Sequence, residues 1–548
     1  MSELRRQLSL PAIAAIGIQG GLGTGAFFST AAMAALAGPS AIVAYVIAGA
    51  IFSLISLSYL ELVTHYPEAG GPARYGYYSH GPLGNLVSAV SSLIWYFFIP
   101  IIEAIATIEG LAYYVPGLLT REGNLTLVGG VLSMIVVAIG VPINYFGIKL
   151  FDRITNGLAW PKNVLYGVVV LAFLIVLGRH ASNFTSFGGF APDGAKGILL
   201  AVPLGIFSFG GVRLIADYAG DSASIKGLRM AMVATLVVET VVLTLFAVAF
   251  VWGLDWKGVG IPVGDWAKVG SISGNPFTAL ASSGNAGWLI PLTVAAAILG
   301  PFVASYVYLG AGSRVVLSLG ASGYTKGRIT EISSRYGTPA WAIWVVGAAG
   351  AVITLLTAPI PGIYSLIGDS VAAGYFAFAI VPAAMVILAI RRQRANGRGR
   401  AISPLMIIVG VLGFGASALA VFWSAWPSVP YGAILVVAVT ILLMVGQKGS
   451  ILKAASGRAW LAFGGYILFI GFLVFMTAIG SEGNLTLLGF IPATIIVAVV
   501  SIAVFFPLAL WVATPSPATE GGSGQNQAGE AFRSEGVLPG SVASSSEP

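Results

Sequence analysis

The sequence of 548 residues predicts an all-α integral membrane protein with about 14 transmembrane helices. Its composition is 57% hydrophobic and only 9% charged, with a mean hydropathy of +0.92, whereas soluble domains carry about 25% charged residues. Apolar stretches of about 20 residues, the length that crosses a bilayer, recur along the chain. A further observation, two glycine-rich interruptions five helices apart, predicts how the core is built.

The first predicted helix is interrupted by a glycine-dense run at residues 16–29, IGIQGGLGTGAFFS. Each glycine in a helix interior costs roughly 1 kcal/mol relative to alanine, so this run opposes a continuous helix. Backbone that leaves the helix at membrane depth is tolerated where it lines a cavity or is buried in protein. The run therefore predicts a binding site near the middle of the bilayer, as in secondary transporters.

Basic residues predict how the chain is oriented. Most of the 27 Lys and Arg residues fall in alternate loops, on the side that holds the N-terminus. Because Lys and Arg accumulate in cytoplasmic loops, we expect both termini in the cytoplasm and the helices in the cell membrane. The net charge of +7 then requires no nucleic acid partner. Residues 514–548, rich in Pro, Ser, Gly and Glu, predict a disordered cytoplasmic tail.

A second interruption is predicted in the sixth helix, at residues 200–220, which contain the run PLGIFSFGGVRLIADYAG. Two broken segments in corresponding positions of two five-helix halves are typical of transporters built as an inverted repeat. The two segments are offset by five helices, an odd number, so they cross the membrane in opposite senses. The core is therefore predicted to hold its binding site where the two broken helices meet.

The two breaks are predicted to recognise opposite ends of an amino acid backbone. Free N–H groups at the start of a half-helix suit a carboxylate, and free carbonyls in the second break suit an ammonium group. Phe207 and Phe209 are candidates for an apolar lid. The predicted substrate-binding residues are Gly23, Thr24, Gly25, Phe207, Ser208, Phe209, Gly210 and Gly211.

Several motifs resemble the amino acid, polyamine and organocation superfamily of permeases, which has the LeuT-type fold. They are Gly23-Thr24-Gly25, the stretch at 38–84 with SYLELVTHYPEAGGPARYGYYSHGPLG, the stretch INYFGIKLFDRITN at 143–156, and GAGSRVVLSLGASG with RYGTPAWA. The resemblance covers roughly residues 8–395. It implies a ten-helix transport core at 1–395 and peripheral helices 11–14 at 396–513.

The resemblance also implies a coupling residue. In proton-coupled members of this superfamily, a fifth-helix lysine places its amine where sodium-coupled relatives hold their ion, and Lys162 looks similar. A lysine inside a membrane helix costs free energy, so it is usually functional or paired with another group. The alternative is that Lys162 extends to the inner interface, since Pro161 is close to the helix start. Ser305 in the eighth helix is a possible partner of Lys162.

Arg213 departs from the superfamily pattern. Many members carry a glutamate at this position of the sixth helix, whereas this chain reads Phe-Gly-Gly-Val-Arg at 209–213. A guanidinium stays charged and would repel a basic substrate side chain. We expect Arg213 to be neutralised by Asp217 or Asp369, to contact the substrate, or to face the inner vestibule.

Other carboxylates in the predicted membrane helices are candidates for a function in transport. Glu103 and Glu109 are six residues apart in the third helix and do not share a helix face, so a joint acid pair is not expected. Either can line the pathway, with Glu109 nearer the outer end. Glu239 in the seventh helix is an isolated carboxylate whose charge should be paired or protonated.

These residues predict a secondary transporter that takes up amino acids with protons. The alternatives are an amino acid or polyamine exchanger without ion coupling, and a nutrient sensor on the same fold. The sequence offers no paired aspartates, Ser/His set or metal-binding His cluster at membrane depth, which argues against an intramembrane enzyme. Zero cysteines exclude thiolate metal sites, and we expect no cofactor and no metal.

Overall fold

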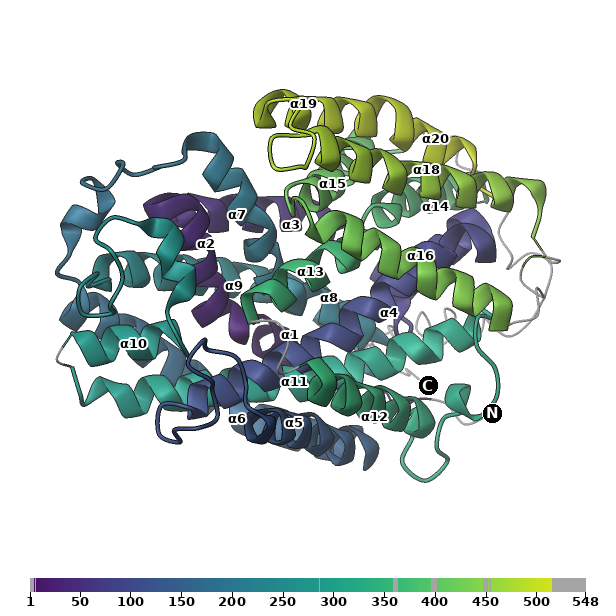
Figure 1. Ribbon diagram of the computed structural model, residues 1–548. Coiled ribbons are helices and arrows are strands. Elements are labelled where there is room, and N and C mark those ends of the chain that lie inside the picture. Colours follow the sequence, from purple (N-terminus) through teal and green to yellow (C-terminus); the bar gives the residue numbers. More distant parts are fainter. Residues whose placement is uncertain are drawn as a thin grey trace, which may run out of the picture.

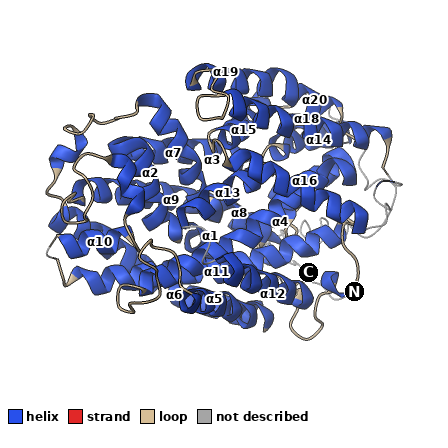
Figure 2. Ribbon diagram, in the orientation of Figure 1, coloured by secondary structure: helices blue, strands red, loops and turns tan. Residues whose placement is uncertain are grey.

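The computed structural model describes residues 4, 6–284, 286–357, 363–395, 402–446, 452 and 455–514. Every named element within these ranges is a helix (Figures 1 and 2). Among the described residues, thirteen helices are long and apolar enough to cross a membrane. The predicted all-α, multi-pass membrane protein is therefore confirmed.

The first half of the core runs from the first interrupted helix to the fifth crossing. Its elements are α1 (Leu10–Gly21), η1 (Gly25–Ser29), α2 (Thr30–Ala37), α3 (Ala41–Val63), α4 (Tyr75–Leu111), α5 (Leu127–Tyr145) and α6 (Ile148–Ala172). The second half holds α7 (Gly194–Ser208), α8 (Gly210–Asp217), α9 (Ile225–Gly253), α10 (Pro276–Ser283), α11 (Leu289–Ala321), α12 (Ala340–Thr357), α13 (Ile363–Tyr375) and α14 (Ile380–Ala395). The remaining helices are α15 (Pro404–Phe422), α16 (Ser428–Gly446), α18 (Gly457–Ile479), α19 (Phe490–Val500) and α20 (Phe506–Trp511).

We predict about 14 crossings from apolar length, whereas thirteen apolar helices are long enough to cross among the described residues. The numbers differ because one of these helices contains a sharp bend. The longest apolar stretch, Gly25–Val63, spans 39 residues and bends sharply at Gly38, whose φ is 58°. Glycine adopts positive φ at little cost, so the bend separates two crossings that were joined in the count. The 12-residue helix α1 is too short to cross alone. Together with α2 it forms the first interrupted helix.

Both predicted interruptions are present, and they differ in width. The first helix stops at Gly21, leaves helical geometry at Leu22 and Gly23, and resumes through the π-helical turn η1. The second break is a single residue, Phe209, between α7 and α8. Leu8, before α1, bridges to Ser222, after α8. The two broken helices therefore run in opposite directions, as an inverted repeat requires.

One end of the molecule, here called the terminal end, holds both the first and the last described segments. The amide of Leu8 donates to the carbonyl of Asp221 at 2.9 Å, and the amide of Thr514 donates to the carbonyl of Ser79 at 3.0 Å. Because Thr514 is packed in this way, it does not belong to the tail predicted at 514–548. The rest of that tail lies outside the described residues.

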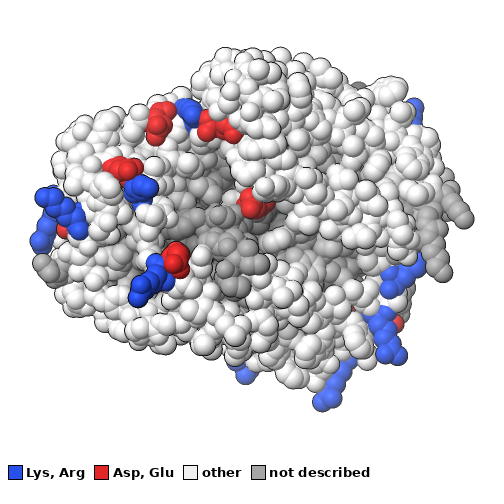
Figure 3. Space-filling model, viewed as in Figure 1, with Lys and Arg blue, Asp and Glu red and all other residues white. Residues whose placement is uncertain are grey.

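Charged side chains are distributed as a membrane protein requires. On the face shown in Figure 3 they gather chiefly toward the two margins, and a broad, mostly uncharged region lies between them. The terminal end is closed by buried ion pairs, of which Arg314 to Asp221 is the shortest, at 2.5 Å. Nearby, Arg74 pairs with Glu68 at 2.6 Å, and burial raises the pKa of that carboxyl although the guanidinium acts against it.

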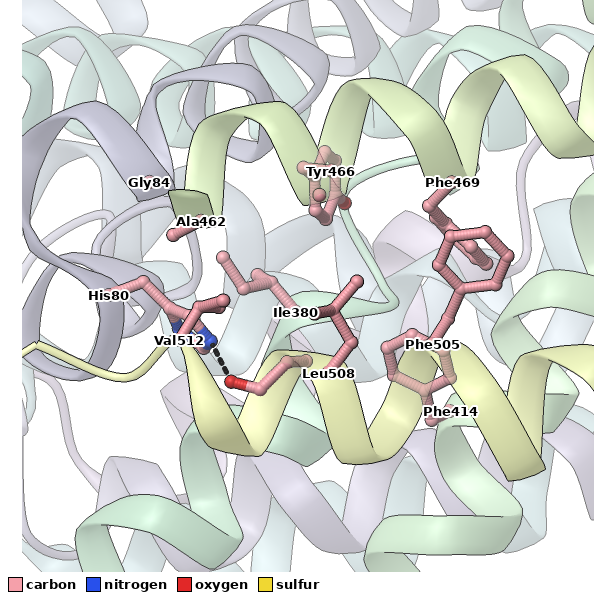
Figure 4. A pocket seen from close by; sticks show the side chains of 12 residues that line it. His80, Gly84, Ile380, Phe414, Ala462, Tyr466, Phe469, Phe505, Leu508 and Val512 are labelled. Carbon is pink, nitrogen blue, oxygen red and sulfur yellow. Dashed lines mark hydrogen bonds between the residues drawn. The ribbon is translucent and has the colours of Figure 1, made fainter. Parts of the chain in front are cut away.

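An apolar pocket near the terminal end lies between the core and the helices after α14 (Figure 4). His80 lies at one end of this pocket and its Nε2 donates to the carbonyl of Ala509 at 2.9 Å, while Phe469 and Phe505 lie at the other end. The cavity volume is about 30 Å³, which is close to the space of one water molecule. This pocket therefore serves packing and is too small for an amino acid.

Candidate functional site

The two breaks lie against each other in the middle of the molecule, where α1, α8 and α9 meet (Figure 1). A Cβ added to Gly25 would lie 2.3 Å from Oγ of Ser208, and a Cβ added to Gly211 would lie 2.1 Å from the carbonyl oxygen of Gly17. Real Cβ atoms do not approach other atoms so closely. The glycines in the two breaks are therefore required by the contact between the two helices.

A carboxylate occupies the start of the second half of the first helix, as its free N–H groups predict. The carboxylate belongs to Glu103 of α4. Its Oε2 accepts hydrogen bonds from the amide of Thr24 at 2.9 Å and from the hydroxyl of Thr24 at 2.8 Å. A negative charge is favourable at the positive end of a helix. The predicted substrate position is thus able to bind a carboxylate, and in this conformation an internal one fills it.

A cation lies at the other side of the same break. Nζ of Lys162 donates to the carbonyl of Gln19 at 2.8 Å, one of the last carbonyls of α1, which lack partners within their own helix. The ammonium also lies 5.5 Å from the centre of the Tyr166 ring. Lys162 is fully buried, so it does not extend to the membrane interface. The two half-helix ends that face the break are capped by charges of opposite sign, Lys162 and Glu103.

Ser305 is not brought to Lys162 in this structure. Its hydroxyl donates to the carbonyl of Pro100 in α4 at 2.9 Å. The reason is the rotation of α11, which turns this position toward α4, whereas Lys162 comes from α6. The expected partnership between the serine and the lysine is therefore replaced by the hydrogen bond from Lys162 to Gln19.

The two phenylalanines of the second break face different neighbours. The ring of Phe207 meets the ring of Trp95 edge to face, with centroids 5.9 Å apart. The ring of Phe209 stacks on Phe52 of α3, at 6.2 Å. The two rings therefore do not pack together in this conformation, and a lid over the ligand stays a prediction. The break at Phe209 is also narrower than predicted, because both flanking residues remain helical.

Arg213 lies four residues beyond the second break and is completely buried. Its Nη2 donates to Oγ of Ser92 at 2.7 Å, and its guanidinium carbon lies 5.2 Å from the ring centre of Tyr96 and 5.5 Å from that of Phe378. Within the described residues, Nε and Nη1 have no hydrogen-bond partner. Asp217 is its neighbouring carboxylate, with Oδ2 3.8 Å from Nε.

Of the two carboxylates predicted to neutralise Arg213, only Asp217 lies beside it. Asp217 also accepts a hydrogen bond from the hydroxyl of Tyr96. Asp369 instead accepts a hydrogen bond from Ser428 of α16 at 2.7 Å, because this part of α13 packs against α16. The expected pairing of Arg213 with Asp369 is therefore wrong for this conformation, and the Asp217 alternative describes the geometry.

Glu109 lies about 9 Å along α4 from Glu103, toward the end opposite the terminal end, here called the distal end. It lines a cavity of about 530 Å³ together with residues of α10, including Asn275 and Thr278 at its start. That Glu109 is nearer the outer end stays a prediction, because it depends on the orientation of the chain in the membrane. Glu103, six residues or about 1.7 turns earlier, is the carboxylate that reaches the site.

Glu239 of α9 reaches both breaks, which its sequence position alone did not reveal. A Cβ added to Gly21 would lie 1.7 Å from its Oε1, and a Cβ added to Gly211 would lie 2.3 Å from the same atom. The side chain is fully buried, and neither carboxyl oxygen has a hydrogen-bond partner among the described residues. An isolated ionised carboxylate in such a place is costly. This arrangement therefore favours a protonated Glu239.

A second cavity, of about 400 Å³, opens at the distal end between α2, α7 and α13. Its lining includes Ala32, Leu204 and Val371. Leu204 is five residues before Phe209, which is about 7.5 Å along a helix. The cavity therefore lies on the distal side of the second break, next to the helix that leads into it.

Comparisons with known proteins show which proteins this chain is similar to. A family model described as amino acid permease matches residues 8–443. An aspartate-proton symporter of Bacillus subtilis is 28% identical over 92% of this chain and 96% of its own length. A glutamate/serine transporter of the same species is 25% identical over 78% of this chain and 79% of its own length. A probable threonine/serine transporter, also from that species, is 24% identical over 65% and 76%.

Proposed function

We propose that this chain, which belongs to the amino acid permease family, takes up amino acids across the cell membrane together with protons. Family membership makes it an amino acid transporter and not an enzyme. Proton coupling is supported by the name of the aspartate-proton symporter, which matches almost the whole chain. The observation that carries the proposal is Lys162, which is buried, has no ion pair with a carboxylate among the described residues, and is hydrogen-bonded to the end of α1.

The position of Lys162 supplies a physical route for coupling. While α1 is closed, its terminal carbonyls stabilise the ammonium. When α1 moves away to open the terminal end, this hydrogen bond is lost, and an apolar surrounding disfavours a charged amine. Lys162 then releases its proton to the side that has opened. Glu103, across the break, adds a negative charge that favours reprotonation when the helix returns.

The proposed orientation places the terminal end in the cytoplasm and the distal end outside the cell. The distribution of basic residues in the loops supports it. The cavity of about 400 Å³ is then the outer entrance. Substrate enters from it, binds between the two breaks, and leaves when α1 and α8 separate from the connection between α3 and α4 that holds Glu68 and Arg74.

Uptake into proteoliposomes tests the coupling. We expect an imposed inward proton gradient to drive accumulation of a labelled amino acid by the unaltered protein. Lys162→Met should lose gradient-driven accumulation and retain exchange of internal for external substrate, because the binding residues are unchanged. The same dependence on pH in both proteins would contradict the role of Lys162.

Two other functions make different predictions in the same assay. An exchanger without ion coupling would show exchange that does not respond to the gradient, and a nutrient sensor would bind amino acids without transporting them. The names of the relatives include aspartate, glutamate, serine and threonine as substrates. They leave the side chain of the substrate open.

A further inference from the structure

We propose that Arg213 binds the side-chain carboxylate of the substrate, so that the substrate class is acidic amino acids. This inference rests on the proposed function, because it assigns the substrate of the same site.

The guanidinium has unused donor capacity. Arginine carries five N–H donors and no acceptor, yet the hydrogen bond from Nη2 to Ser92 is the one in which Arg213 takes part within the described chain. The oxygen of Asp217 is 3.8 Å from Nε, which is longer than a hydrogen bond. A fully buried charge with free donors is expensive unless a partner completes it. Arg213 therefore lacks the bidentate carboxylate that its geometry accepts.

The spacing between the second break and Arg213 suits a short acidic side chain. Arg213 is three residues beyond Gly210, which is about 4.5 Å along a helix. A Cβ added to Gly210 would lie 2.3 Å from the hydroxyl of Tyr308. The ring of Tyr308 lies 5.9 Å from that of Tyr96, and Tyr96 lies under the guanidinium. The rings of Tyr308 and Tyr96 therefore connect the second break with Arg213.

Internal carboxylates already lie at both places where an acidic amino acid would put its own. Glu103 binds the amide and hydroxyl of Thr24 at the first break, and Asp217 lies beside Arg213 after the second. The site therefore holds one negative charge for the position of the α-carboxylate and one for the position of the side chain. A basic side chain would be repelled by Arg213, and an uncharged one would leave its positive charge without a new partner.

The test compares labelled aspartate with labelled asparagine, which differ only in the charge and one atom of the side chain. We expect the unaltered protein to take up aspartate at least about 10-fold more efficiently than asparagine, because a site built for a carboxylate leaves its donors unpaired with the amide. Arg213→Gln should lower aspartate uptake by at least about 10-fold and change asparagine uptake far less. Equal losses for both amino acids would overturn the inference.

Asp217→Asn separates substrate recognition from a merely structural ion pair. If Asp217 competes with the substrate for Arg213, this variant should bind aspartate several-fold more tightly, measured as thermal stabilisation of the purified protein by aspartate. If the pair is only structural, the variant should lose stability and bind both amino acids equally or more weakly, which would overturn the inference. Lys196→Gln is the matched control, since Lys196 is a partly exposed lysine near the start of α7 that pairs with Glu482. Its selectivity should be unchanged.

The two proposals fail in different ways. Aspartate binding that depends on Arg213, without any response of uptake to a proton gradient, would overturn proton coupling and leave the substrate class standing. Gradient-driven uptake of neutral amino acids, with no competition by aspartate, would overturn the substrate class and leave the proposed function standing.

Discussion

The first and second broken helices differ in how they bind charge. The first break is open over Leu22 and Gly23, and it holds its carboxylate with the neutral donors of Thr24. The second break is one residue wide, and the buried charge beyond it is the guanidinium of Arg213. Neutral backbone donors suit the group that all amino acids share, and a permanent cation suits a group that few of them have. If Arg213 binds the substrate as proposed, general and selective recognition are assigned to different helices.

The largest expected effect comes from the tight contact at the second break. In Gly211→Ala the added methyl would meet the backbone oxygen of Gly17 at 2.1 Å, whereas in Gly23→Ala it would meet the carboxyl of Glu103 at 2.5 Å. A side chain can shift more cheaply than backbone. We therefore expect Gly211→Ala to abolish uptake and to lower the thermal unfolding temperature, and Gly23→Ala to keep measurable uptake.

Uptake per mole of reconstituted protein and thermal unfolding measure both effects. Gly464→Ala is the control, because nothing lies within 4 Å of a Cβ added there in α18. If Gly211→Ala and Gly464→Ala behaved alike, the described contact between α8 and α1 would not be required for function.

A smaller effect is expected at the first break. Thr24→Val removes the hydroxyl donor and keeps the amide, so the KM should rise by about 10-fold, which corresponds to the net value of about 1.4 kcal/mol for one such hydrogen bond. The rise should be the same for aspartate and asparagine, since both have the backbone carboxylate. Thr477→Val, the same change at a buried threonine of α18, should leave KM unchanged. A loss confined to aspartate would place side-chain recognition at the first break and reverse the comparison.

The smallest effect is expected for Asp369→Asn. Its carboxylate accepts a hydrogen bond from Ser428 and not from Arg213, and an amide oxygen can accept the same bond. We expect the ratio of aspartate to asparagine uptake to change by less than about 2-fold, within the range of a surface substitution. A large shift in this ratio would show that Asp369 reaches Arg213 in another conformation.

The sequence was sufficient for the fold and for the location of the first break because both depend on local composition. Long apolar stretches predict crossings without reference to one another, and the glycines around Gly23 oppose a helix wherever it packs. The resemblance to permeases was equally local, since it rested on short motifs. The family match over residues 8–443 confirms it.

The sequence was not sufficient for the charges around the site because they depend on how each helix is rotated. Glu103 reaches Thr24 across 79 residues of chain, and Glu239 reaches both breaks from a third element. Spacing within α4 or α9 does not reveal which helix a carboxylate will face. The same reason explains why Ser305 faces α4 and why Asp369 faces α16.

The hydrogen bond from Thr24 to the carboxylate of Glu103 bears on the step in which the empty transporter reorients. An uptake transporter must reorient without cargo after each cycle, whereas an exchanger must be prevented from doing so. With Glu103 bound at the first break, the helix end meets a carboxylate in the empty site as it would with substrate, so reorientation does not leave it exposed. Net uptake is then limited less by the empty return than it would be if Thr24 faced an unfilled space.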